Sequence, residues 1–149
     1  MAVDGKVAYE WSKVLNFTTR GNALPYCVSG WGEPETGLVW TDGPNARLSF
    51  SIRPPKSDIS LLMTCAPFLV EGKVPFQELH VFVNFLRVGF AVLPAPTEVA
   101  VDIPKHVFAS PQVQIDFYLP RASSPASLGV GTDLRQLGVA VSRLMLTEE

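Results

Sequence analysis

The chain has 149 residues, 47% of them hydrophobic and 17% charged, and a formal net charge of −2. So low a charged share, against roughly 25% in an average globular domain, excludes general disorder, and the scattered basic residues exclude a surface that follows nucleic-acid phosphates. Asn84 and Arg87 interrupt the longest apolar stretch, so no membrane insertion is expected. The N-terminus lacks a signal-peptide pattern. We therefore expect one soluble cytoplasmic domain over residues 1–149, with a piece excised from a longer membrane-associated protein as the open alternative.

Turn-forming residues set the spacing of the expected elements. Thirteen prolines and eleven glycines recur at short intervals and leave segments of strand length between them. The clearest segment runs from Ala46 to Ile52, where apolar and polar side chains alternate and predict one buried and one solvated face. In chain order, the expected strands are residues 38–41, 46–52, 58–68, 77–84, 88–93, 97–103, 113–119 and 137–146.

The remaining segments complete this pattern. Residues 104–108 predict one helical turn that begins at a proline, and residues 21–37 and 121–133 are expected to be irregular. The last strand keeps its apolar face only if a bulge lies near Arg143. About eight strands without intervening long helices predict an all-β fold, namely a two-sheet antiparallel β-sandwich of the jelly-roll kind.

Motifs of known chemistry are absent from the sequence, so no catalytic residue, metal site or cofactor is predicted. Cys27 and Cys65 lack the spacing of metal or redox ligands and are expected to be free thiols, with one disulfide as the alternative. Glu33 and Glu35 favour a hydrolase only weakly, because two carboxylates from one short loop seldom flank a glycosidic bond on opposite sides. An enzyme is therefore the less favoured class.

Aromatic and polar residues gather in one stretch and suggest a ligand site. Trp31 and Trp40 lie within ten residues of each other, close to Glu33 and Asp42, and flat apolar faces beside hydrogen-bonding groups suit a sugar ring. The alternative is that the indoles fill the core, which is favoured for Trp40. Arg135 is expected to pair with Glu33 or Asp42 and so to tie a late segment to an early one.

Two passages resemble one known family. Residues 30–43 contain the pattern GW-x-x-PE…W-x-DG, and residues 124–138 contain SP-x-x-LG…D-x-R-x-LG. Together they are similar to the signatures of a bacterial domain of unknown function that occurs in glycosyltransferase- and surface-polysaccharide-associated proteins. Where that family usually has Asn-Gly, this chain has Asn84 followed by Phe85, which leaves the turn type open. The resemblance implies a β-sandwich associated with glycan assembly or secretion.

Two functions from different classes follow. The first is a noncatalytic carbohydrate-recognition or accessory module linked to bacterial polysaccharide biosynthesis, with a glycan ligand and a glycosyltransferase partner. The alternative is a structural protein that forms a homo-oligomer or docks on a partner through an apolar sandwich face. The carbohydrate-binding residues expected for the first are Trp31, Glu33, Trp40, Asp42 and Arg135.

Overall fold

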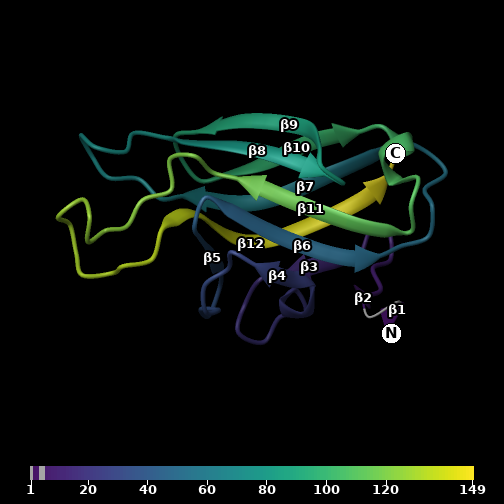
Figure 1. Cartoon of the computed structure of the whole chain (residues 1–149), viewed down its shortest axis with the longest axis horizontal. Coiled ribbons are helices and arrows are strands. Elements are labelled where there is room, and N and C mark those ends of the chain that lie inside the picture. Colours follow the sequence, from purple (N-terminus) through teal and green to yellow (C-terminus); the bar gives the residue numbers. More distant parts are fainter. Residues whose placement is uncertain (1, 4–5) are drawn as a thin grey trace.

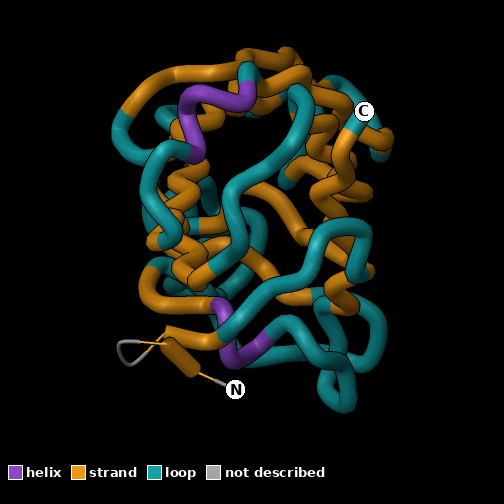
Figure 2. The backbone as a smooth tube through the Cα atoms, turned by 90° about the vertical axis from the view of Figure 1, so that its right-hand side faces the viewer, coloured by secondary structure: helices purple, strands orange, loops and turns teal. Residues whose placement is uncertain are grey.

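The computed structural model describes the backbone of residues 2–3 and 6–149, which forms two packed five-stranded sheets (Figures 1 and 2). Two short 3-10 helices, η1 and η2, join the strands. No helix within these ranges is long and apolar enough to cross a membrane. The elements are β1 (Ala2–Val3), β2 (Lys6–Val7), β3 (Val14–Asn16), η1 (Leu24–Tyr26), β4 (Cys27–Ser29), β5 (Val39–Asp42), β6 (Asn45–Ser51), β7 (Ile59–Pro67), β8 (Gln77–Val83), β9 (Leu86–Leu93), β10 (Thr97–Ile103), η2 (Lys105–Phe108), β11 (Gln112–Tyr118) and β12 (Leu137–Glu148).

The order of the strands defines a small sheet of β1 and β2 and two five-stranded sheets, which we call the first and the second. The first sheet has the order β4-β6-β11-β8-β9, and the second has the order β10-β7-β12-β3, with β5 also paired to β12. All pairs within them are antiparallel. The predicted all-β sandwich is confirmed. The second sheet covers the inner face of the first, and the opposite face of the first sheet, its outer face, points away from the second sheet.

The core lies between the sheets and is built by the alternation expected from the sequence. Leu48 and Phe50 of β6, Val81 of β8 and Ile115 of β11 are each at most 1% exposed, and they face strand residues of the second sheet such as Met63. Side chains that alternate with them therefore point to the outer face of the first sheet. The core thus fixes which residues of β6, β8 and β11 a ligand can reach.

Several local predictions are confirmed. The register between β12 and β7 shifts between Val141 and Arg143, which is the expected bulge, and η2 is the expected helical turn. Both cysteines are free, and burial raises the pKa of Cys65 to about 11 and that of Cys27 to about 12, so both thiols are neutral at ordinary pH. The prediction that residues 21–37 are irregular is wrong for β4, because a three-residue strand is too short to show a period.

Candidate functional site

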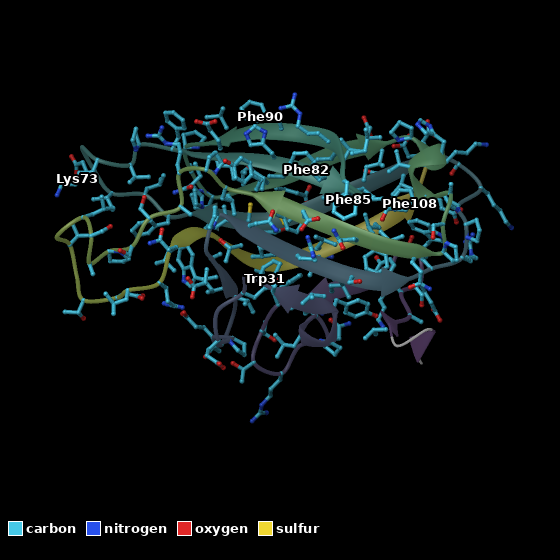
Figure 3. All side chains as sticks on the ribbon, viewed as in Figure 1. Trp31, Lys73, Phe82, Phe85, Phe90 and Phe108 are labelled. Carbon is cyan, nitrogen blue, oxygen red and sulfur yellow. The ribbon has the colours of Figure 1, made fainter. Side chains whose placement is uncertain are left out.

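The outer face of the first sheet carries polar and aromatic side chains in rows that cross its strands. In one row Asn45 of β6, Tyr118 of β11, His80 of β8 and Phe90 of β9 lie opposite one another. The next row contains Arg47, Asp116 and Phe82 (Figure 3). Residues directly opposite on one face of an antiparallel sheet are in side-chain contact distance, so these rows form one continuous surface.

An almost buried carboxylate lies at the centre of this surface. Asp116 is only 6% exposed, and its Oδ1 accepts hydrogen bonds from Asn45 Nδ2 at 3.0 Å and from Arg47 Nε at 2.9 Å. Gln114 Nε2 donates to Asp116 Oδ2 at 2.9 Å. Burial alone would raise the pKa of Asp116, but these three hydrogen bonds and the charge of Arg47 outweigh it and hold the pKa below its usual value. Asp116 is therefore ionised and anchors its three neighbours.

The Asp116 network leaves part of Arg47 free. The side chain of Arg47 is 36% exposed, and its Nε donates a hydrogen bond to Asp116. Its two Nη groups have no acceptor among the residues that the structure describes. A guanidinium held at one edge, with its other donors directed away from that partner, is prepared to bind hydroxyl or carbonyl oxygens at little entropic cost.

Replacing Asp116 by Asn should flatten the acid limb of the stability profile. A carboxyl whose pKa is lowered in the folded state contributes stability fully above its ordinary pKa of 3.8, and that contribution is lost as the pH falls below about 4 toward the lowered value. Urea midpoints measured at several pH values should fall more steeply for the wild type than for Asp116→Asn in this window. Parallel profiles would show that Asp116 carries no stabilising charge.

A strained aromatic residue overhangs the same surface. Asn84 and Phe85 form the two-residue turn between β8 and β9, with φ of 48° and 69°, and Val83 pairs with Leu86 on either side of it. Two-residue turns made by Asn-Gly usually have this left-handed geometry. The turn type that the sequence left open is therefore the Asn-Gly type, although Phe85 stands in place of glycine. Phe85 takes this conformation at a cost of about 1–2 kcal/mol, yet it is 76% exposed and fills no core position. Strain in an exposed aromatic indicates a function.

Asn84 fixes the turn over the sheet. Its Oδ1 accepts a hydrogen bond from the backbone N–H of Gln114 at 3.0 Å, and its Nδ2 donates to the carbonyl of Val107 at 3.1 Å. The side chain therefore joins the turn to β11 and η2 at once. Phe85 is held in place by these bonds rather than by packing of its own ring.

Two hollows lie on either side of Phe85. The first has a volume of about 350 Å³ and is lined by Asn45, Arg47, Phe82, Phe85 and Asp116. The second has a volume of about 180 Å³ and is lined by Phe85, Asn84, Val113 and polar residues of β6 and β11. Both combine aromatic rings with hydrogen-bonding groups. No group of three or more His, Cys, Asp or Glu side chains that could hold a metal ion occurs in the described part of the chain.

An aromatic row extends this surface toward the sheet edge. The ring of His80 lies 4.7 Å from that of Phe90 and 5.6 Å from that of Tyr118. Arg87 Nη1 lies 3.3 Å from His80 Nδ1, and His80 Nε2 lies 3.9 Å from a Glu78 carboxylate oxygen. These contacts fix the orientation of the imidazole between two exposed rings.

The tryptophans expected at a sugar site lie elsewhere. Trp31 is half-buried against Phe17 and Phe117, with ring centroids 5.4 and 6.3 Å apart, and its indole N–H donates to the carbonyl of Arg47 at 2.9 Å. Trp40 is half-buried on β5 of the second sheet and packs edge-on against Phe68. The indoles therefore do not converge on one surface.

The polar residues expected beside them form a loop cluster with different partners. The Asp42 carboxylate accepts the backbone N–H of Gln136 at 2.9 Å, while Glu33 is exposed. The prediction that Arg135 pairs with Glu33 or Asp42 is wrong: Arg135 Nη2 lies 2.8 Å from Asp133, two residues away, and Nη1 lies 3.8 Å from Glu35. The Asp133 carboxylate accepts the backbone N–H, the Nε and the Nη2 of Arg135, and this set of three hydrogen bonds holds the guanidinium at Asp133.

Sequence reasoning missed the residues on the outer face of the first sheet. The polar members of the alternating segments 46–52 and 113–119 were interpreted only as a solvated side. The available signal was chemical rather than periodic, because that side repeats amide, guanidinium and carboxylate groups instead of the lysines and glutamates of an ordinary wet face. The residues concerned are Arg47, Phe82, Phe85, Gln114, Asp116 and Tyr118.

Comparison with known proteins gives no sequence relative. No family model matches the chain, and no curated protein sequence matches it. Solved structures do match. The C-terminal family 6 carbohydrate-binding module of a laminarinase from Zobellia galactanivorans superposes with a TM-score of 0.54 over 92% of this chain and 99% of that module, at 11% identity. A family 36 module of a multidomain xylanase from the hindgut metagenome of Trinervitermes trinervoides gives a TM-score of 0.53 at 12% identity, over 93% of this chain and 98% of that module.

This chain shares the β-sandwich fold of carbohydrate-binding modules. A similar match, with a TM-score of 0.53 and 13% identity, covers 92% of this chain but only 17% of a family 115 glucuronidase with specificity for decorated arabinogalactans. The chain thus corresponds to a small part of that enzyme. At such low identity the likeness establishes the sandwich and leaves the ligand to be argued from the surface of the first sheet.

Proposed function

We propose that the chain is a noncatalytic carbohydrate-recognition module whose ligand lies on the outer face of β6, β11 and β8. One observation carries the proposal, namely the guanidinium of Arg47, held by Asp116 with its Nη donors free, beside the exposed ring of Phe85. A sugar presents hydroxyl oxygens at its rim and C–H groups on its faces. A fixed fork of donors and an aromatic plane match these two features.

The chemistry of the face supports binding without catalysis. Hydrolysis of a glycosidic bond usually requires two carboxyl groups on opposite sides of the bond. Asp116 is the carboxylate that lines the first hollow, and three donors already occupy it. The residues that line the second hollow include no carboxylate. The exposed Glu33 and Glu35 lie in the loop cluster with Arg135. We therefore assign the face to recognition.

The biological setting belongs to the same proposal. The sequence patterns of residues 30–43 and 124–138 resemble a domain of polysaccharide-associated bacterial proteins, and the sandwich is shared with modules of a laminarinase and a xylanase. Both observations support an accessory role in which the chain holds a glycan for an enzyme. We infer that the enzyme partner is a glycosyltransferase of bacterial polysaccharide biosynthesis.

Calorimetric titration against a glycan panel tests the proposal. Suitable probes are laminarin, xylan, arabinogalactan and a bacterial surface polysaccharide. We expect at least one to bind, and we expect Arg47→Lys to weaken binding roughly tenfold, because lysine keeps the charge and loses the planar fork. The matched control is Arg143→Lys, which alters an exposed arginine of β12 in the second sheet and should leave affinity unchanged. Failure of every glycan to bind would contradict the proposal, as would equal affinities in the wild type and Arg47→Lys.

One observation favours an assembly function as the second candidate. Leu86, Phe90 and Val92 of the edge strand β9 are each just over half exposed. Exposed apolar side chains on an edge strand promote pairing with another chain. Light scattering after size-exclusion chromatography distinguishes the candidates: a dimer that Val92→Glu dissociates and that binds no glycan would replace the recognition function.

A further inference from the structure

The row of hollows continues beyond Phe85 to the end of β6. A third hollow, of about 630 Å³, is lined there by Trp11, Glu10, Ser51, Arg53 and neighbouring residues. Ser51 follows Ser49, which lines the second hollow, on the same face of β6. The three hollows therefore succeed one another along β6 and β11.

Two polar atoms without partners lie between the second and third hollows. The Oγ of Ser51, a residue only 4% exposed, and the Oε1 of Gln112 are buried and have no hydrogen-bond partner in the described part of the protein. Ser51 and Gln112 are directly opposite each other in the register of β6 and β11. Buried polar atoms are rarely left unpaired, and a ligand that displaces the half-buried Gln112 side chain would gain a donor and an acceptor here.

Trp11 supplies an oriented aromatic ring at the far end. Its indole N–H donates to the carbonyl of Arg53 at 3.2 Å, and its ring packs edge-on against Phe108 at 5.4 Å and Tyr9 at 6.5 Å. Figure 3 shows Phe82 and Phe85 near each other and Phe108 toward the end of the sandwich, where it belongs to the core and is 1% exposed. Trp11, which is only half-buried and packs on Phe108, is therefore the ring that a ligand can reach at that end.

We propose that these elements form one extended groove, with a distal subsite at Trp11, and that its ligand is a linear oligosaccharide bound along its length. The inference rests on the proposed function and specifies its ligand class. From Arg47 to Ser51 alone the groove advances about 13 Å, because a strand rises about 3.3 Å per residue, and the Trp11 hollow lies beyond. A single sugar ring is too short to contact both ends.

An extended peptide fits this groove less well than a glycan. β6 and β11 pair with each other along their length, and β11 also pairs with β8 from Ile115 to Tyr118, so a peptide cannot add as a strand between them in the middle of the sheet. The groups that remain free are side-chain donors and acceptors between aromatic rings. These suit a chain that carries hydroxyl groups on every unit.

Affinity as a function of chain length tests the groove. Oligosaccharides from disaccharide to hexasaccharide, prepared from each of laminarin, xylan, arabinogalactan and the bacterial surface polysaccharide, would be titrated into the full chain by calorimetry. We expect wild-type affinity to rise roughly tenfold from the shortest ligand that binds to the longest. This is the gain in affinity expected when one more aromatic contact and its hydrogen bonds are added. Trp11→Ala should remove this gain and leave short-chain affinity unchanged.

Two further variants keep the test decisive. Ser51→Ala removes the unpartnered hydroxyl without enlarging the core. It should therefore reduce the gain in affinity with chain length even if Trp11→Ala fails to fold. Trp40→Ala on the second sheet is the control and should keep this gain. Equal affinity at all lengths, or a Trp11→Ala variant that keeps the gain, would overturn the groove and leave the proposed function standing. An absence of binding at every length would overturn both.

Discussion

Replacing Phe85 by glycine is expected to stabilise the protein and to abolish glycan binding. Phe85 has a φ of 69°, which glycine adopts without steric cost, and its exposed side chain contributes little packing. The variant should gain about 1 kcal/mol, or about 2–4 °C in melting temperature for a chain of this size. Binding should fall by tenfold or more, since the ring lines both central hollows. Thermal unfolding and calorimetric titration of the same preparations measure the two effects.

Phe85→Ala separates the ring from the strain. Alanine removes the aromatic plane but must still adopt the positive φ, so binding should be lost without the gain in melting temperature. If Phe85→Gly melted higher and bound as tightly as the wild type, the turn would be strained for a reason other than glycan recognition. If it melted lower, Phe85 would have a packing role that its exposure does not indicate.

Removing the indole of Trp31 is expected to damage the fold rather than the site. Trp31 packs against Phe17 and Phe117 and holds the carbonyl of Arg47, so Trp31→Ala should lose about 3–5 kcal/mol of unfolding free energy in urea titrations. The milder Trp31→Phe keeps the aromatic contact and loses the hydrogen bond, and should cost about 1 kcal/mol. Titrated in its folded state, Trp31→Phe should bind glycan as the wild type does.

The Trp31 variants also test whether glycan binds at the site expected from the sequence. A folded Trp31→Phe protein of normal stability that no longer binds would favour the loop region with Trp31, Glu33, Trp40, Asp42 and Arg135. Trp40→Phe on the second sheet provides the matched comparison, because Trp40 packs on Phe68 and lines none of the three hollows of the proposed groove. Loss of binding in both would point to that region rather than to the first sheet.

The sandwich could be predicted from the sequence because its determinants are local. Alternation from Ala46 to Ile52 and the turn residues between segments set the faces and ends of strands, and the phase change near Arg143 revealed its bulge. β3 and β4 were missed because three-residue strands form only through pairing with remote segments. Sheet order, likewise, depends on contacts that no local pattern encodes.

The candidate site could not be predicted because strand pairing assembles it. Arg47 and Asp116 are 69 residues apart in the sequence and meet only through the register of β6 and β11. Phe85 was noted solely as a departure from glycine at a turn, and its exposure became evident with the fold. The two indoles have different packing partners although Trp31 and Trp40 are near each other along the chain, and the site expected there stays a prediction that the tryptophan variants test.

Mapping of backbone amide shifts by nuclear magnetic resonance, during titration with the glycan that binds in the panel, tests the central claim most directly. The largest changes should lie in β6, β11 and the turn at Asn84 and Phe85, and with long chains they should extend to Trp11. Residues 30–42 and 133–136 should shift little. Changes confined to those loops, with β6 and β11 unaffected, would contradict the assignment of the outer face of the first sheet as the glycan site.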